Sequence, residues 1–358
     1  MKKYDVAIIG ATGMVGQRFI TLMKDHEWFN IKVLAASGRS ANKKYSEAVR
    51  GRWSMAESIP QTVENLVLYD ATADAKKIAS EVDFAFCAVD MNKDELRALE
   101  ERYAKLECPV VSNNSAHRGT PDVPMIIPEI NPEHAKVIDF QRKRLGTKRG
   151  FISVKSNCSL QSYVPALFPL NKFEPRDVLC CTYQAISGAG KTFETWPEML
   201  DNVIPFIGGE EEKSENEPLK IWGKVEKGGI ISAKTPRFTT QCIRVPVSDG
   251  HLAAVFASFN IKPEIDEVIH IWKNFSGRPQ QLGLPSAPKQ FLNYFDDDGF
   301  PQTKMHRELE NGMAISLGRL RPDSQYDIKF VGLSHNTIRG AAGGAVLMAE
   351  LLCAEGYI

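Results

Sequence analysis

Short, unbroken apolar runs recur through the first 155 residues, separated by stretches with helical periodicity. The runs cover residues 5–9, 31–36, 82–89, 109–112 and 151–154. Runs of this length without polar alternation are typical of parallel strands that are buried on both faces. Because strands and helices alternate here, with the clearest helical period at 93–106, the pattern predicts an α/β fold with a doubly wound parallel sheet.

The hydrophobic pattern changes in the second half of the chain. Longer strands are predicted at 178–186, 239–247 and 252–259, and the last two flank a turn sequence at 248–250. Strands that return through short turns form antiparallel or mixed sheets. We therefore expect an α+β second domain, followed by an apolar C-terminal helix of small residues at 345–352.

Three glycines follow the first predicted strand and precede a helical run. Strand, glycine turn and helix form the setting in which a dinucleotide pyrophosphate binds at a helix N-terminus. The spacing G-x-x-G-x-x-G is a variant of the commoner one, and no Gly-Lys-Ser/Thr closes it as in a P-loop. The predicted cofactor-binding residues of this turn are Gly10, Thr12, Gly13, Met14, Val15 and Gly16.

The end of the second predicted strand bears on the choice between NAD and NADP. A site selective for NAD usually places a carboxylate there to hold the ribose 2′-hydroxyl. The chain instead has Ser37, Arg39 and Ser40, and an arginine with two hydroxyls can hold a 2′-phosphate. We therefore expect NADP at these three residues, the alternative being that Arg39 is a solvated loop residue.

Cys158 lies between a predicted strand and a helix-forming run, in the sequence Lys-Ser-Asn-Cys-Ser at 155–159. Free backbone N–H groups at a helix start lower the pKa of a thiol and can later hold an oxyanion. Cys158 is therefore a candidate nucleophile, and the alternative is a small residue buried at a helix start. Arg118 follows the strand 109–112, at the edge where parallel sheets bind ligands, and is a candidate anion clamp.

A cysteine nucleophile needs a partner that handles protons. His251 is the candidate base, because Arg244 and His251 stand at the two ends of one strand-turn and can reach one small anion. The alternative is a structural histidine. The histidines expected at the surface, among charged residues, are His26, His134, His270 and His306.

Composition narrows the class of protein. With 43% hydrophobic and 25% charged residues and a formal net charge of zero, the chain is not expected to bind nucleic acid or a membrane surface. The basic run 141–149 is interpreted as a solvated helix end, and most of the acidic run 210–217 as a solvated helix face. Seven cysteines without metal spacing, and no transmembrane or signal-type segment, predict reduced thiols in the cytoplasm and no metal site.

Five motifs, in this order, resemble those of the aspartate-semialdehyde dehydrogenase family, in its archaeal and fungal branch. They are Gly-Ala-Thr-Gly-Met-Val-Gly at 10–16, Ser-Asn-Cys-Ser at 156–159, Gln-Ala-Ile-Ser-Gly-Ala-Gly at 184–190, Arg-Val-Pro-Val-x-x-Gly-His at 244–251 and Asn-Thr-Ile-Arg-Gly-Ala-Ala-Gly-Gly at 336–344. The resemblance covers nearly the whole chain. It implies a Rossmann-type NADP-binding domain at 1–155 and 336–358, and a catalytic and dimerisation domain at 156–335.

The resemblance implies NADPH-dependent reductive dephosphorylation of L-aspartyl 4-phosphate to L-aspartate 4-semialdehyde, in the biosynthesis of lysine, threonine and methionine. Cys158 would attack the acyl phosphate and expel phosphate, and hydride would reduce the thioester. The other residues it implies are His251 as acid/base, Gln184 to orient substrate, Arg244 on the α-carboxylate, Glu210 on the α-amino group, Lys213 and Arg118 on phosphate, Asn157 before the nucleophile, and Ser187, Gly188, Asn336 and Gly340 near the cofactor.

Three alternatives compete with this reading. Archaeal malonyl-CoA reductase shares the fold but has no need of Glu210, Lys213 and Arg118. N-acetylglutamyl-phosphate reductase acts on a substrate without a free ammonium for Glu210. A non-catalytic NADP-binding sensor would need the glycine turn but not Cys158.

The resemblance also implies small-molecule substrates and a homodimer or homotetramer. The sequence does not decide which of Glu210, Glu211 and Glu212 contacts substrate, or what the irregular region 50–62 does.

Overall fold

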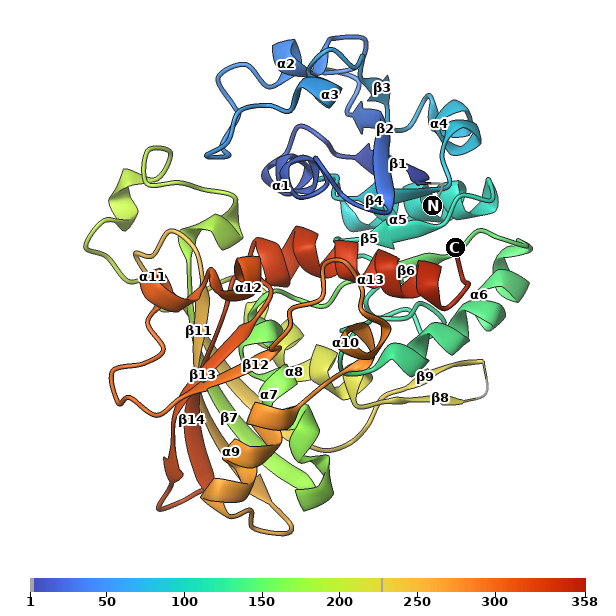
Figure 1. The fold of residues 1–358 in the computed structure, drawn as a ribbon. Helices are drawn as coiled ribbons and strands as arrows, with labels where there is room; N and C mark the ends of the chain where they lie inside the picture. The colour runs from blue at the N-terminus through green and yellow to red at the C-terminus, as the bar shows by residue number, and fades with distance from the viewer. Residues whose placement is uncertain (1–2, 227) are drawn as a thin grey trace.

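The computed structural model describes residues 3–226 and 228–358, which form two main sheets with helices packed against them (Figure 1). The first sheet has the order β3-β2-β1-β4-β5-β6, and every neighbouring pair of strands is parallel. The order reverses between β1 and β4, which is where doubly wound sheets bind ligands. The predicted α/β fold with a parallel sheet is confirmed.

The elements of this part follow the predicted apolar runs closely. Its strands are β1 (Tyr4–Ile9), β2 (Phe29–Ala36), β3 (Tyr69–Asp70), β4 (Phe84–Cys87), β5 (Val110–Ser112) and β6 (Ile152–Val154). Its helices are α1 (Met14–Leu22), α2 (Tyr45–Ala48), α3 (Gln61–Glu64), α4 (Ala75–Glu81), α5 (Lys93–Lys105), α6 (Ile138–Leu145) and the C-terminal α13 (Gly343–Ala354).

The second sheet is mixed, as expected, with the order β10-β7-β11-β14-β13-β12. Its two outer pairs are parallel and its three inner pairs antiparallel. Its strands are β7 (Pro175–Gln184), β10 (Arg237–Arg244), β11 (His251–Phe259), β12 (Leu292–Phe295), β13 (Ile315–Pro322) and β14 (Ile328–Ser334), and β8 (Lys224–Glu226) and β9 (Gly229–Ile231) form a separate ribbon. The helices of this part are α7 (Val164–Leu167), α8 (Glu210–Ile221), α9 (Ile265–Asn274), α10 (Arg278–Leu282), α11 (Thr303–His306) and α12 (Leu309–Gly312).

Helix α13 returns from the second sheet to the first and runs between the two in the ribbon (Figure 1). Every residue from Gly343 to Leu352 is buried, and the helix packs on β5 and α1. Apart from Glu350, which binds His26, these residues are apolar or glycine, so no face of the helix is suited to water. None of the helices in the described residues is long and apolar enough to cross a membrane.

The region 50–62, left open by the sequence, closes over the start of α1. Gln17 donates to the Arg52 carbonyl at 2.9 Å and accepts from the Ser54 backbone at 2.8 Å. Trp53 packs edge-on against Tyr45 of α2. These contacts support the helix start that follows the glycine turn.

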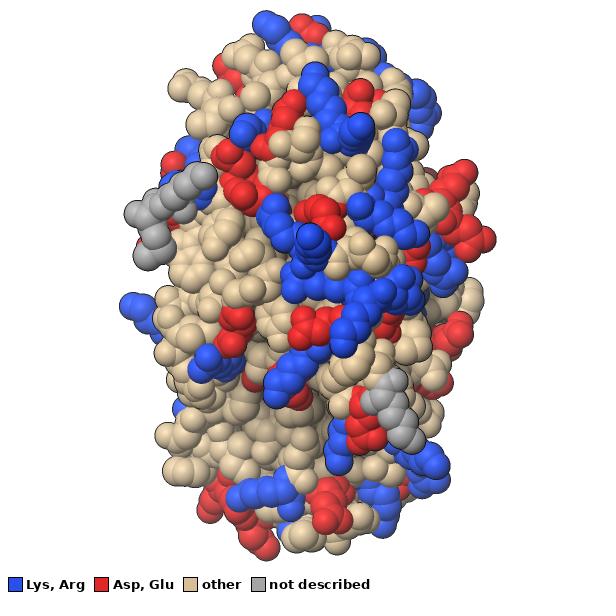
Figure 2. All heavy atoms as spheres, turned by 90° about the vertical axis from the view of Figure 1, so that its right-hand side faces the viewer, with Lys and Arg blue, Asp and Glu red and all other residues tan. Residues whose placement is uncertain are grey.

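The basic run 141–149 forms the end of α6 and the turn after it, as predicted. Arg144 pairs with Asp122 and with Glu101, and Glu107 accepts the backbone N–H groups of Lys148 and Arg149. On the face that carries this helix, Lys and Arg side chains form a band with Asp and Glu among them (Figure 2). Neighbouring carboxylates thus offset the local positive charge.

Helix α8 carries Pro218 in its interior. Proline lacks the N–H group that would donate to the carbonyl of Ser214, four residues earlier. The buried Tyr163 hydroxyl donates to that carbonyl instead, at 3.1 Å. This bond ties α8 to the segment that follows Cys158.

We expect Tyr163→Phe to lower the free energy of unfolding by about 1–3 kcal/mol, because the Ser214 carbonyl is then buried without a donor. In a Pro218→Ala background the helix regains a backbone donor, so the same substitution should cost less. Urea denaturation of the wild type, both single variants and the double variant measures this coupling. Equal costs in the two backgrounds would contradict the proposed exchange of donors.

Candidate active site

Cys158 stands at the carboxyl end of β6, directly before the one-turn helix η2 (Ser159–Ser162). From Gly150 to Leu167 every residue is buried except Cys158, which is half-buried. The buried residues around it hold the backbone of this turn in place. Cys158 is therefore the one residue between Gly150 and Leu167 that is not fully packed away from the surface.

Asn157 fixes this turn against α8. Its side-chain oxygen accepts from the backbone N–H and the hydroxyl of Ser159, at 2.8 and 2.7 Å. Its side-chain nitrogen donates to both oxygens of Glu210, at 3.0 and 2.9 Å. Its backbone N–H donates to Glu217 at 2.6 Å. Asn157 is thus bound to two carboxylates of α8, one through its side-chain nitrogen and one through its backbone N–H.

Among Glu210, Glu211 and Glu212, it is Glu210 that faces the Cys158 turn. Besides Asn157 it accepts hydrogen bonds from Lys213 at 2.8 Å and from Gln184 at 3.2 Å. Burial alone would raise the pKa of Glu210, but the Lys213 ammonium and the amide donors outweigh it and lower that pKa. Glu212 is exposed, and Glu211 accepts from the Cys242 backbone instead.

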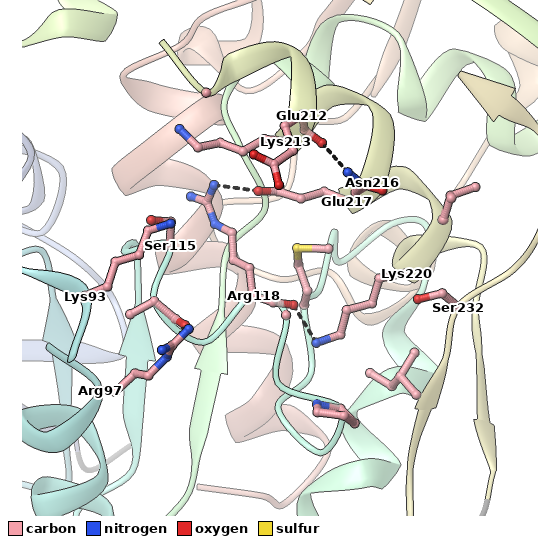
Figure 3. A pocket seen from close by; sticks show the side chains of 17 residues that line it. Lys93, Arg97, Ser115, Arg118, Glu212, Lys213, Asn216, Glu217, Lys220 and Ser232 are labelled. Atoms are coloured by element: carbon pink, nitrogen blue, oxygen red, sulfur yellow. Dashed lines mark hydrogen bonds and ion pairs between the residues drawn. The ribbon is translucent and has the colours of Figure 1, made fainter. Parts of the chain in front are cut away.

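Glu217 was missed in the sequence analysis, which assigned the acidic run mostly to solvent. It is buried, and its second oxygen accepts from the Arg118 guanidinium at 2.9 Å (Figure 3). Glu210, Lys213, Glu217 and Lys220 follow one another at intervals of three and four residues, which places them on one face of α8. That spacing was the available signal.

Lys220 holds the loop that carries Arg118. Its ammonium donates to the backbone carbonyls of Arg118, Thr120 and Val123, at 2.7, 2.7 and 2.8 Å. Three carbonyl acceptors saturate an ammonium, so its role here is structural. Burial, the largest influence, lowers the pKa of Lys220 to about 8.

A cavity of about 540 Å³ opens between the α5 side of the first domain and α8 (Figure 3). Lys93, Arg97, Arg118 and Lys213 are among the residues that line it, which makes it rich in positive charge. Cys158, Gln184, Arg244 and His251 do not line it. The predicted phosphate residues therefore adjoin this cavity, while the other predicted catalytic residues gather around the Cys158 turn.

Arg244 and His251 are both held by backbone groups of Ala185, at the end of β7. Arg244 donates to the Ala185 carbonyl at 2.6 Å, and the Ala185 N–H donates to His251 Nδ1 at 3.1 Å. The turn that follows Ala185 and contains Gly188 lies over the side chains of Arg244 and His251. A methyl group on Gly188 would come within 2.9 Å of the guanidinium and 3.1 Å of the imidazole, so glycine is needed for this close approach.

The bond to Nδ1 decides the tautomer of His251. Because Nδ1 accepts, the ring proton of the neutral imidazole sits on Nε2, which is buried and has no hydrogen-bond partner in the part of the chain that the structure describes. Burial, followed by the Arg244 charge, lowers the pKa of His251 to about 3, so the ring is neutral. In this arrangement His251 offers a hydrogen-bond donor to a reactant, whereas a base needs a free ring nitrogen.

The expectation of a lowered thiol pKa is wrong. Burial, followed by the Glu210 charge, raises the pKa of Cys158 to about 11, although Lys155, Arg118 and Arg244 act in the opposite direction. The helix η2 has a single turn, so few peptide dipoles add at its start. The thiol is therefore protonated at neutral pH.

The surface prediction for four histidines is also largely wrong. Only His270 among them is exposed. His26 bonds to Glu350 at 2.8 Å and His134 to the Gly223 carbonyl at 3.0 Å, while His306 is buried among aromatic rings. The partners of His26 and His134 come from distant segments, which the charged neighbours in sequence do not reveal.

The glycine turn fits a dinucleotide pyrophosphate. Gly10 has a φ of +95°, and a methyl group there would lie 2.5 Å from the Ala88 carbonyl. Gly16 packs so closely on Gly10 that a methyl group would lie 2.2 Å from its carbonyl. Gly13 caps α1 without a side chain, and the first turn carries no acid, so the N–H groups are free for an anion. Thr12, Met14 and Val15 are partly exposed on this turn.

The end of β2 carries the residues expected near a 2′-phosphate. Ser37 and Arg39 are exposed and Ser40 is buried. The structure also places one carboxylate at this site, that of Asp70 at the end of β3. It lies so close to Gly38 that a methyl group on Gly38 would be 2.8 Å from it. Its other oxygen caps the backbone that follows, accepting from Thr72 at 2.8 Å. The sequence search looked only at the end of β2 and did not find it.

Of the residues expected near the cofactor, Gly340 lies beside the thiol, and Asn336 joins the turns around His251. Asn336 accepts from the Gly250 backbone at 2.8 Å and donates to Ser187 at 2.9 Å, which joins it to the turns around His251. A methyl group on Gly340 would lie 2.8 Å from Cβ of Cys158. Gly340 belongs to the short π-helical turn η6 (Ile338–Ala342), which packs on α1. The glycine turn and the thiol are thus linked through η6.

Comparison with known proteins identifies relatives over the whole chain. Two family models match, the semialdehyde dehydrogenase NAD binding domain over residues 5–138 and the semialdehyde dehydrogenase dimerisation domain over residues 167–339. The aspartate-semialdehyde dehydrogenases of Aspergillus fumigatus and Methanothermobacter thermautotrophicus are 39% and 40% identical, over 99% and 97% of this chain and 99% and 98% of theirs. The crystal structure of aspartate semialdehyde dehydrogenase with NADP from Candida albicans has a TM-score of 0.89 at 36% identity, covering 100% of both chains.

Because the Glu210 charge raises the pKa of Cys158, Glu210→Gln should lower it. Each unit of pKa corresponds to about a tenfold larger thiolate fraction at a fixed pH below the pKa. We therefore expect faster alkylation of Cys158 by iodoacetamide at pH 8, followed by peptide mass spectrometry. Glu212→Gln, an exposed position on the same helix, is the matched control. Equal rates in the two variants would show that the Glu210 charge does not govern the thiol.

Proposed function

The chain belongs to the aspartate-semialdehyde dehydrogenase family, and on that premise we propose how its site carries out the family reaction. It reduces L-aspartyl 4-phosphate to L-aspartate 4-semialdehyde with NADPH and releases phosphate, in the biosynthesis of lysine, threonine and methionine. The proposal rests on the hydrogen bonds of Asn157 to Glu210 and Glu217, which we call the Asn157 clasp. The clasp holds the Cys158 turn against a buried carboxylate, and Lys213, Arg118 and Arg244 lie nearby. An acyl phosphate with an α-amino acid end needs this combination of one nucleophile, one anion and several cations.

Each residue takes the role that its chemistry allows. The Cys158 thiolate attacks the acyl carbon, the C–O bond to phosphate breaks, and a thioester forms. Lys213 and Arg118 hold the phosphate from the cavity side. Glu210 takes the α-ammonium group, and Gln184, bonded to Glu210, orients the chain of the substrate. Arg244 has one guanidinium nitrogen on Ala185 and presents the others to the α-carboxylate.

His251 donates Nε2–H to the acyl oxygen as negative charge develops on it. This role follows from the Ala185 bond, which keeps Nδ1 occupied. NADPH supplies the hydride that reduces the thioester. The Gly10–Gly16 turn binds its pyrophosphate, Ser37, Arg39 and Ser40 bind the 2′-phosphate, and Ser187, Gly188, Asn336 and Gly340 lie at the nicotinamide.

We divide the chain into a cofactor domain at 1–155 and 336–358, and a catalytic and dimerisation domain at 156–335. The outer face of the second sheet supports self-association as a homodimer or homotetramer. Leu252 lies opposite Tyr183 and Phe256 opposite Leu179 on that face, and all four are partly exposed. Within the described residues all seven cysteines are free, which supports the cytoplasm as the compartment.

The decisive test runs the reaction backwards. Pure protein with L-aspartate 4-semialdehyde, inorganic phosphate and NADP should form NADPH, followed by its absorbance, and Cys158→Ala should abolish this while NADP still binds. Malonate semialdehyde with CoA is the parallel assay. Activity only with CoA would assign a malonyl-CoA reductase, and a folded, NADP-binding protein inactive in both assays would be a sensor.

Arg39→Ala should raise the KM for NADP about tenfold or more, because a charge-assisted contact to the 2′-phosphate is lost. The KM for NAD should change little, since NAD has no such phosphate. Lys43→Ala, exposed a few residues further on, is the control. A parallel change of both KM values would remove Arg39 from the 2′-phosphate site.

A further inference from the structure

The motif at 336–344 contains an arginine that the proposed reaction does not use. Arg339 belongs to the turn η6 and is 1% exposed, although its guanidinium always carries a positive charge. Its neighbour Gly340 packs against Cys158. A buried charge is unfavourable unless its partners are well placed, so an arginine at this position calls for a reason.

The partners of Arg339 come from two other segments of the chain. Nη1 and Nη2 bind the two oxygens of Glu129, the first at 2.8 Å, so the guanidinium forks onto this carboxylate. Nε donates to the side-chain oxygen of Gln161 at 3.1 Å. The guanidinium also lies over the Phe291 ring, 4.6 Å from the ring centroid. These contacts fix both the place and the orientation of the side chain.

Gln161 connects the guanidinium to the segment that carries the nucleophile. It lies in η2, three residues after Cys158. Its side-chain nitrogen donates to the Ser156 hydroxyl at 3.0 Å, and its backbone N–H donates to the Cys158 carbonyl at 3.3 Å. A single glutamine thus joins Arg339 to the residues on which the position of the thiol depends.

Glu129 anchors the other end of the fork. It is buried on the segment between β5 and α6, in the part of the chain that carries the parallel sheet. Gly277 packs so closely on it that a methyl group there would lie 2.7 Å from Cα of Glu129. Glu129 therefore has little room to move, and it gives Arg339 a fixed point from which to hold Gln161.

We infer that Arg339 is a positioning residue that fixes the Cys158 turn, by forking onto Glu129 while it holds Gln161. This role rests on the proposed function of Cys158 as the nucleophile. An attacking atom must lie about 3–3.5 Å from the carbon that it attacks, and a displacement of about 1 Å can cost about 10²-fold in rate. The Asn157 clasp holds the turn from α8, and Arg339 holds it from the opposite end of η2.

Arg339→Lys is the first test, because an ammonium keeps the positive charge but cannot fork onto Glu129 and also reach Gln161. We expect kcat for NADP reduction to fall about 10- to 10²-fold. The KM values for phosphate and NADP should change little, because the residues assigned to those ligands lie on other segments. In the ligand-free protein, amide hydrogen exchange in peptides covering 156–163 should become faster than in the wild type.

A second set of variants separates positioning from stability. Arg339→Met leaves a buried carboxylate without its partner and should lower the melting temperature. The double variant Glu129→Leu/Arg339→Met should regain most of that loss, because replacing a whole buried ion pair by apolar residues is often neutral. Its kcat should remain low, since neither new side chain binds Gln161. Gln161→Met keeps the ion pair and should also lower kcat and speed exchange over 156–163.

Arg144→Lys is the matched control. Arg144 also forks onto a carboxylate, that of Asp122, but it lies at the surface on α6. The same loss of a fork there should leave kcat and the exchange of 156–163 as in the wild type.

Three outcomes would overturn the inference. They are a double variant that regains kcat together with its melting temperature, exchange over 156–163 that is unchanged in Arg339→Lys, and an equal loss of kcat in Arg144→Lys. Melting and hydrogen exchange use neither substrate nor cofactor. Failure of the proposed function would instead appear as a wild type without turnover, so the two failures are distinguishable.

Discussion

The contact between Asn157 and helix α8 is the constraint on which the site depends. One amide side chain binds the Glu210 carboxylate, and its backbone N–H binds Glu217. The first contact sets the distance between the thiol and the Glu210 carboxylate, to which we assign the substrate ammonium. The second fixes the carboxylate that orients Arg118. Because Asn157 follows the last strand of the parallel sheet, the clasp also fixes how the two domains meet at the cleft.

The contacts between Asn157 and α8 require charged side chains on the inner face of this helix. Glu210, Glu217 and Lys220 are all buried on α8, and buried ions are tolerated only when their partners are well placed. Each of them has those partners, which come from backbone carbonyls, amides and a guanidinium. The charged face therefore contributes organisation of the site more than stability. The Ser214 carbonyl of α8 is also satisfied by a side chain, because the Tyr163 hydroxyl replaces the backbone donor that Pro218 lacks.

Local chemistry made much of the fold predictable. Apolar runs marked the parallel strands, and the glycine spacing marked the helix start, because both depend on neighbours in sequence. The choice among Glu210, Glu211 and Glu212 needed the phase of α8, which the sequence pattern left open. The pKa of Cys158, the tautomer of His251 and the burial of Arg339 needed tertiary contacts. Such quantities depend on how far a side chain is removed from water, and that is set by residues distant in the sequence.

Ala185 holds Arg244 and His251 through its carbonyl and its N–H, so two side chains of the site depend on the backbone of a residue whose own side chain is a methyl group. Most substitutions leave both backbone groups in place, and an alanine scan passes over the position entirely. Proline is the exception, because it lacks the N–H and its ring suits the Ala185 φ of −63°. The placement of two proposed site residues is therefore encoded in chain geometry, which an alanine scan does not test.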